Sequence, residues 1–298
     1  MNYALGILLQ LIATCTVSVA NIFDNQLTRK TFSSIWSLVV LNGLILIPLV
    51  PVLFFILRPE NLTQAQLVLI LFIACVEVLY QIPYYHALRE TDTSVVVSLF
   101  SFQRIFIPIF AYFVVSERLS LTQYIGFAMI VLSSILITFK RSSFKFNKAI
   151  GYMVPVTIIL SLTASLEKYG LNQMSWNTFF FWSLILTIPF YFLILIFIKS
   201  SRPEVKIFMK NPFKKKYAQL YLQNGISFVS GGFATAALSL IPVTIAKAVG
   251  SIQAIFVHLV ASKGNKSLQV ESKEKFSFAK VGLFLLTSVG IILTIVHI

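Results

Sequence analysis

The sequence predicts an all-α integral membrane protein with ten transmembrane helices, arranged as two inverted five-helix repeats. Three observations support this fold class. Of the 298 residues, 57% are hydrophobic and only 11% are charged, whereas soluble globular domains have roughly 25% charged residues. Ten apolar segments have the length needed to cross a bilayer. One of these stretches also recurs, recognisably, in the second half of the chain.

The ten predicted spans follow one another with mostly short joins. A span needs about 20 predominantly apolar residues. The segments that reach this length lie at residues 3–23, 33–57, 65–87, 93–115, 120–139, 149–167, 176–198, 217–240, 243–262 and 277–297. The join Glu117-Arg118 between the fourth and fifth spans leaves no room for a soluble domain. The first span lacks a preceding basic region and a following small-residue cleavage site, so we expect it to remain uncleaved.

An internal repeat relates the two halves. The stretch Ala87–Ala111 aligns without a gap to Ala237–Ala261, with seven identities in 25 positions, and the flanking segments recur in the same order. Self-similarity at a fixed spacing indicates a duplication. We therefore expect one five-helix repeat at residues 1–140 and a second at 149–298. Because five is odd, the two halves must cross the membrane in opposite senses, as in many secondary transporters.

The basic residues predict an orientation. The net charge is +14, and loops that follow odd-numbered spans hold 19 lysines and arginines against three on the other side. The positive-inside rule places the richer side in the cytoplasm and both termini outside. These residues sit in short loops between apolar segments, a pattern typical of membrane topology rather than of nucleic-acid binding.

Several short motifs resemble one transporter family. The turn Ser116–Ser120, followed by Tyr124–Gly126, is similar to the Gly-Glu-Arg-Leu turn of the EamA-type branch of the drug/metabolite transporter superfamily. Ala87–Arg89 and Thr93–Val95 also fit its pattern. A serine opens the turn where glycine is usual, and the second half has Lys263–Lys266 instead of the Glu-Arg turn. The resemblance implies ten spans, of which the first, third, fourth, sixth, eighth and ninth line a central cavity. Members are often described with cytoplasmic termini, opposite to the charge count.

Few charged residues lie away from the ends of the predicted spans: Glu77 in the third, Arg104 in the fourth and Lys247 near the start of the ninth. Such groups are costly in a bilayer and usually face protein or a water-filled cavity, so they are candidates for substrate binding or coupling. Residues three and four apart share a helix face, which gives Glu77 three polar neighbours: Tyr80, Gln81 and Tyr84. Alternatively, Glu77 and Arg104 only neutralise each other between packed helices.

Further candidates carry hydroxyl and amide groups. Ser101 and Gln103 in the fourth span correspond to Ser251 and Gln253 in the ninth. The two glutamines are expected to meet near the pseudo-two-fold axis at mid-membrane, since an amide has no reason to face lipid. Asn21 lies on a polar face of the first span. An alternative role for the serines is hydrogen bonding between close-packed helices.

Other features indicate no enzyme chemistry. Cys15 and Cys75 lie inside apolar segments, and we interpret them as small buried hydrophobic residues. The three histidines lack metal-ligand spacing, and no nucleotide-binding loop or nucleophile motif occurs. We therefore expect no catalytic residue, no metal site and no cofactor. Glu167-Lys168 ends the sixth span, where a salt bridge at the interface and snorkelling explain both residues.

The function indicated is secondary transport of a small polar organic metabolite, such as an amino acid, by alternating access. Glu77 would accept a coupling proton or bind a substrate amine, and Arg104 and Lys247 would hold a carboxylate. An alternative within transport is an exchanger of phosphorylated or nucleotide-linked solutes, favoured by two cations against one anion. From a different class, a non-transporting membrane subunit or lipid-headgroup receptor would use the polar faces for packing.

The expected partners follow from this function. They are a small-molecule solute and the lipid bilayer of the cell membrane, without nucleic acid. A homodimer through the fifth and tenth spans is a candidate assembly. A solvent-filled cavity lined by Glu77, Arg104, Gln103 and Gln253 would distinguish transport from mere helix packing.

Overall fold

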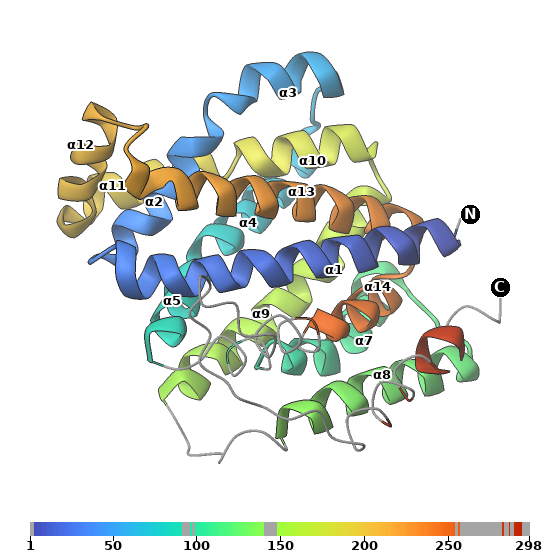
Figure 1. Ribbon diagram of the computed structural model, residues 1–298. Coiled ribbons are helices and arrows are strands. Elements are labelled where there is room, and N and C mark those ends of the chain that lie inside the picture. Colours follow the sequence, from blue (N-terminus) through green and yellow to red (C-terminus); the bar gives the residue numbers. More distant parts are fainter. Residues whose placement is uncertain are drawn as a thin grey trace.

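The computed structural model describes residues 3–90, 96, 99–139, 148–253, 256, 282, 286 and 289–293, and the regular structure of these residues is helical (Figure 1). The first half contains α1 (Tyr3–Gln26), the π-helix η1 (Leu27–Thr31), α2 (Ile35–Leu46), α3 (Leu49–Leu57), α4 (Gln64–Leu79), α5 (Gln81–Glu90), α7 (Ser101–Val115) and α8 (Leu121–Phe139). The second contains α9 (Lys148–Leu171), α10 (Trp176–Ile185), α11 (Ile188–Phe197), η2 (Lys199–Ser201), α12 (Arg202–Lys210), η3 (Lys215–Tyr217), α13 (Ala218–Leu240), α14 (Val243–Val249) and η4 (Gly250–Ile252).

Several of these helices have the length and composition of membrane spans. Within the described residues, Tyr3–Thr31, Gln64–Glu90 and Trp176–Phe197 are long and apolar enough to cross a bilayer. A fourth span results if α2 and α3, which are bent by 47°, are counted together. Pro48 lies at that bend, where its missing amide hydrogen removes a helical hydrogen bond. The structure is therefore an all-helical, multi-pass membrane protein, and ten spans remain a prediction.

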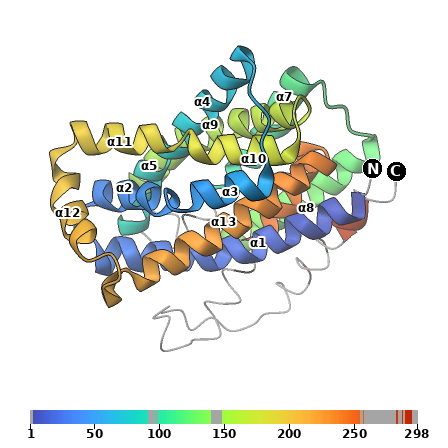
Figure 2. The same ribbon diagram turned by 90° about the horizontal axis from the view of Figure 1, so that it is seen from above.

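The longest helix pair joins opposite ends of the chain. Figures 1 and 2 show α1 and α13 side by side along their lengths, running in opposite directions. The Ser230 hydroxyl donates to the Ala13 carbonyl at 2.8 Å, and the side chains of Gln219 and Gln26 bond near the other end. Helix α9 makes the corresponding contacts from the second half, since it packs against α4, α5 and α7.

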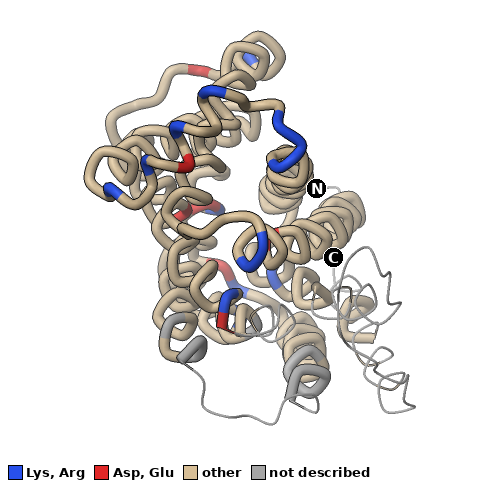
Figure 3. The backbone as a smooth tube through the Cα atoms, turned by 60° about the vertical axis from the view of Figure 1, so that its left-hand side comes forward, with Lys and Arg blue, Asp and Glu red and all other residues tan. Residues whose placement is uncertain are grey.

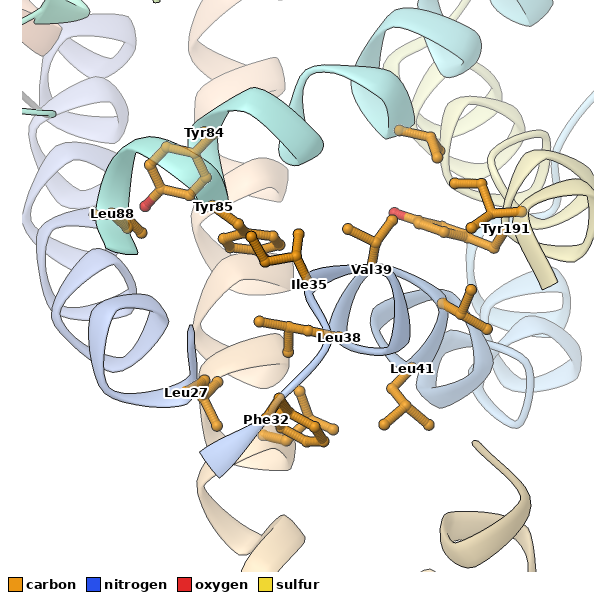
Figure 4. Packing of buried hydrophobic residues seen from close by; sticks show 14 of the residues in the cluster. Leu27, Phe32, Ile35, Leu38, Val39, Leu41, Tyr84, Tyr85, Leu88 and Tyr191 are labelled. Carbon is orange, nitrogen blue, oxygen red and sulfur yellow. The ribbon is translucent and has the colours of Figure 1, made fainter. Parts of the chain in front are cut away.

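A buried cluster holds α2 against α5, α11 and the segment after α1. Leu38 and Val39 are fully buried in it, between Tyr85 of α5 and Tyr191 of α11 (Figure 4). Gly43 allows α2 to approach Tyr191, because a Cβ at position 43 would lie 2.0 Å from a ring carbon of that tyrosine. Tyr191 is thereby fixed next to the polar groups described below.

The helix-connecting segments gather at two ends of the bundle. Arg89, after α5, donates to the carbonyls of Phe32 at 2.8 Å and Ser33 at 2.9 Å, which follow η1. The Ser37 hydroxyl donates to the Ser201 carbonyl at 3.1 Å, which brings the basic segment at α12 to the same end. Figure 3 shows the lysines and arginines of these segments in blue. Loops after the first, third and seventh predicted spans thus lie at the same end of the bundle. This is expected when successive spans cross the membrane in alternating directions.

Candidate functional site

A cavity of about 490 Å³ lies among the helices. It is lined from α1, α4, α5, α7, α9, α13 and α14, which correspond to the six spans expected to surround a central cavity. The second and seventh predicted spans also contribute, through Asn42 of α2 and Tyr191 of α11. Both halves of the chain therefore build the same polar space.

Nearly all of the candidates predicted from the sequence line this cavity. They are Asn21, Glu77, Tyr80, Gln81, Tyr84, Gln103, Arg104, Lys247 and Gln253. Ser251 is instead fully buried, and its hydroxyl donates to the Ala248 carbonyl at 2.5 Å within the same helical segment. Ser101 begins α7, and its side chain lies outside the described part of the structure.

Arg104 binds the carboxyl end of α14. Its Nε donates to the Lys247 carbonyl at 3.0 Å and its Nη2 to the Gly250 carbonyl at 2.9 Å. The last carbonyls of a helix lack intrahelical partners and carry partial negative charge, so a guanidinium there is well matched. Arg104 is only 6% exposed. These contacts give it a role in holding α7 to α14, in addition to its position at the cavity.

Lys247 pairs with Glu167, which corrects one expectation. The Lys247 Nζ lies 3.7 Å from Glu167 Oε2, and both side chains line the cavity. The sequence assigned Glu167-Lys168 to the membrane interface at the end of a span. That assignment was wrong, because α9 continues to Leu171 and keeps Glu167 inside the bundle. Lys168 is buried as well, and its Nζ donates to the Leu238 carbonyl at 2.7 Å.

The first half of the chain also matches a known family. Residues 4–139 fit the model described as the EamA-like transporter family. This match covers slightly less than half of the chain. This family is part of the drug/metabolite transporter superfamily, and its members are membrane transporters rather than enzymes.

Comparisons with individual proteins agree on the fold alone. No curated protein matches the EamA-like chain. One solved structure, titled only as a crystal structure of a protein, superposes with a TM-score of 0.62 at 14% identity. The alignment covers 95% of this chain and 97% of that one. The shared architecture therefore extends well beyond the residues that the family model matches.

The Glu-Arg turn of the EamA-like half has a structural role. Glu117 follows α7, and its carboxylate accepts hydrogen bonds from the backbone amides of Val243 at 2.8 Å and Thr244 at 3.1 Å. A carboxylate satisfies the unpaired amides that begin a helix and complements its dipole. The turn of one half thus caps α14 of the other half, beside the cavity.

A buried acid that the sequence analysis missed lies in the same EamA-like unit. Asp24 is 5% exposed and lines the cavity. Its Oδ2 lies 3.1 Å from the hydroxyl of Tyr84, and its Oδ1 lies 3.4 Å from that of Tyr85. The Tyr84 hydroxyl also lies 3.1 Å from Asn21 Oδ1. The signal was the spacing of Ser18, Asn21 and Asp24, which continues one polar helix face.

An amide network closes the opposite wall. The Asn42 side-chain amide donates to the Tyr85 hydroxyl at 2.8 Å and to Gln81 Oε1 at 3.2 Å. Gln81 in turn donates to the Tyr191 hydroxyl at 2.8 Å. Asn224 of α13 donates to Asn42 Oδ1 at 3.0 Å. Four helices from both halves of the chain are thereby connected. Tyr191 and Asn224 were not singled out from the sequence.

The two glutamines at equivalent repeat positions both reach the cavity. Gln103 donates from Nε2 to the Leu160 carbonyl at 3.0 Å, and its own carbonyl accepts from the Ser161 hydroxyl at 2.7 Å. Gln103 therefore also fastens α7 to α9. Gln253 follows η4 and lines the same space. Both glutamines thus line one cavity, and their meeting near a pseudo-two-fold axis at mid-membrane stays a prediction.

Proposed function

We propose that the protein is a secondary transporter that moves a small polar organic metabolite, such as an amino acid, by alternating access around the central cavity. The observation that carries this proposal is the cavity of about 490 Å³, which charged and hydrogen-bonding side chains from both halves line. Its size lies within the range of small-molecule sites, roughly 300–1,000 Å³. Such a polar space favours transport over mere packing of helices.

The lining suits a solute that carries both charges and an organic body. Lys247 would hold a carboxylate, and Glu77 or Glu167 would hold an amine or accept a coupling proton, since all three side chains line the cavity. Aromatic faces of Tyr80 and Phe180 add apolar contact. Arg104 is engaged with backbone carbonyls, so we assign the direct contact with a carboxylate to Lys247 in preference.

Alternating access would rest on two inverted repeats, residues 1–140 and 149–298. The packing supports this arrangement by its reciprocity. The first predicted span, α1, packs on the eighth, α13, while the sixth, α9, packs on the third, α4 and α5. A two-fold axis in the membrane plane exchanges these two pairs. The second and seventh spans also meet, since α2 packs on α11 and α3 packs on α10.

The charge of the lining disfavours the exchanger of phosphorylated solutes. Among the charged residues that the sequence placed within spans, two are cations, Arg104 and Lys247, and one is an anion, Glu77. The cavity adds Asp24 and Glu167, which brings three carboxyl groups to the same space. A phosphate group would meet this negative charge in a low-dielectric site, where like charges repel strongly.

The proposed topology keeps the charge-based orientation, with both termini outside and the basic end in the cytoplasm. A homodimer through the fifth and tenth spans is also retained as a proposal. Most of the tenth span lies outside the described residues. Within one chain, Gly290 approaches α8 so closely that a Cβ there would lie 2.8 Å from the Gly126 carbonyl oxygen.

The direct test uses purified protein in sealed liposomes. An amino-acid mixture is presented with and without an inward proton gradient, and uptake is followed by mass spectrometry of the washed vesicles. We expect accumulation above the external concentration of at least one amino acid, abolished by an uncoupler. Equal contents in protein-containing and empty vesicles, for amino acids, amines, nucleosides and sugar phosphates alike, would refute the proposal.

A further inference from the structure

Two buried polar atoms at the α1–α13 contact are left without a hydrogen-bond partner. They are Nδ2 of Asn21 and Oε1 of Gln223, and among the described side chains no other buried nitrogen or oxygen atom is in this state. The two residues are 6% and 4% exposed, respectively, and both line the cavity. Buried polar groups in folded proteins are almost always paired, so each exception calls for an explanation.

The two amides lie opposite each other. Helices α1 and α13 are antiparallel, with Ala13 bonded to Ser230 and Gln26 bonded to Gln219. Asn21 is eight residues beyond Ala13, and Gln223 is seven residues before Ser230, so this register sets them at the same level. The remaining polar atom of each amide is used within the protein. Asn21 Oδ1 accepts from Tyr84 at 3.1 Å, and Gln223 Nε2 donates to Ser227 at 3.1 Å.

This amide pair is separate from the charged pair. Gly250, three residues after Lys247, lies beside Thr14 of α1, because a Cβ placed on Gly250 would be 4.0 Å from Thr14 Oγ1. The charged pair is therefore near the height of Thr14 along α1. Asn21 is seven residues further along α1, which corresponds to about 10 Å at 1.5 Å per residue. The cavity thus has a zone with Lys247 and Glu167, and a second zone where two neutral amides converge.

The chemistry of the second zone selects an uncharged polar group. One free donor beside one free acceptor is complemented by a group that both accepts and donates. A carboxylate would lie close to Asp24, which shares the Tyr84 hydroxyl with Asn21, and it has no hydrogen to offer Gln223. Exchanging oxygen and nitrogen in both amides together keeps one free donor beside one free acceptor, whereas an exchange in Asn21 alone would present two acceptors and would select an amine instead.

We propose that Asn21 and Gln223 form a substrate subsite that binds a carboxamide or a similar neutral donor–acceptor group. This inference rests on the proposed transport function and specifies the substrate class. The solute would carry its charged groups near Lys247 and Glu167, and its carboxamide at the α1–α13 contact. A site built to hydrogen-bond a substrate discriminates strongly against analogues that leave its polar groups unpaired.

The test compares carboxamide and apolar probes of similar size on the full-length purified protein. L-glutamine is paired with L-methionine, and L-citrulline, which reaches further, is paired with L-norleucine. Dissociation constants are measured by calorimetry for the wild type, Asn21→Leu and Gln223→Met. We expect the wild type to prefer at least one carboxamide probe over its apolar match by about tenfold or more, a factor that one hydrogen bond can supply. Each variant should reduce that ratio to near one.

Gln219→Met serves as the matched control, because Gln219 lies one turn away on the same helix and bonds Gln26 outside the cavity lining. It should keep the wild-type ratio. Unchanged ratios in Asn21→Leu and Gln223→Met would overturn the subsite while leaving transport intact. An equal change for both probes of a pair would mean that the amides hold only water, and would also overturn it. Absence of binding by all four probes to a protein that transports other solutes would refute the carboxamide assignment alone.

Discussion

The carboxylate of Glu117 accepts a hydrogen bond from the backbone amide of Val243 at 2.8 Å, across 126 positions of the sequence. A second bond reaches Thr244 at 3.1 Å. These contacts tie the end of α7 to the beginning of α14. Since Arg104 of α7 binds the other end of α14, the two helices are joined at both ends, and Lys247 takes part in the second connection through its carbonyl.

Glu117→Gln should therefore weaken the attachment of α14. The amide retains one acceptor oxygen but loses the charge that favours the helix amino end, so we expect a loss of roughly 0.5–2 kcal/mol. Thermal unfolding in detergent, followed by circular dichroism, measures the change. Arg118→Gln is the control, since it removes a charge from the same turn, where Arg118 lies 5.9 Å from the Tyr112 ring. Equal midpoints for the wild type and Glu117→Gln would contradict the capping role.

Glu77→Gln tests coupling. The amide keeps the shape of the side chain and cannot titrate, so we expect concentrative uptake to disappear while exchange of solute across the membrane persists. Both rates are measured in the same liposomes. If Glu77 instead binds a substrate amine, only amines should lose affinity. Full transport by the double variant Glu77→Gln and Arg104→Gln would exclude both residues from the mechanism, and would favour mutual neutralisation.

The Lys247–Glu167 pair allows a double-mutant cycle. The two side chains are 27% and 15% exposed, so removing one partner should cost less than the about 3–5 kcal/mol that is typical of a fully buried pair. Lys247→Met and Glu167→Gln should therefore each lower the unfolding temperature, and the double variant should recover much of it. Uptake should stay low in the double variant, because the group proposed to hold the substrate carboxylate is gone. Recovery of uptake together with stability would assign the pair a purely structural role.

Orientation can be measured independently of transport. Lys215 belongs to the basic end and is exposed, whereas Arg58 belongs to the opposite end. Single cysteines at these positions, in a variant without Cys15 and Cys75, are treated in intact cells with a reagent that does not cross membranes. We expect labelling at position 58 and protection at position 215. The reverse pattern would place the basic end outside and would agree with cytoplasmic termini.

Nine residues of the cavity lining were predicted from the sequence, because a polar side chain within an apolar span is costly in lipid and usually faces protein or a cavity. Glu77, Gln103 and Lys247 were found in this way, and the structure brings all three to one cavity. Asp24 and Glu167 were missed for a common reason. The predicted spans end at or just before these two acids, because the hydropathy of the sequence falls at the first charged residue. The helices continue past both, to Gln26 and Leu171.

Other parts of the site depend on contacts between distant segments, which no local sequence pattern predicts. Tyr191 lies in an apolar stretch rich in aromatic residues, and only its packing on Gly43 and its bond from Gln81 distinguish it. Asn224 is one of several polar residues of α13, and its bond to Asn42 requires the position of α2. The capping bonds of Glu117 join opposite halves, so the turn motif alone did not reveal them.

The pairing of α1 with α13 also bears on how the protein is made. Ala13 and Ser230 are 217 residues apart, so the ribosome releases α1 long before its partner exists. During that interval α1 carries Gln10, Asn21 and Asp24 into the membrane before α13 and the other later segments that help to bury them are made. Polar groups in lipid are costly. The nascent first helix therefore needs a sheltered or hydrated place beside the insertion machinery until α13 arrives.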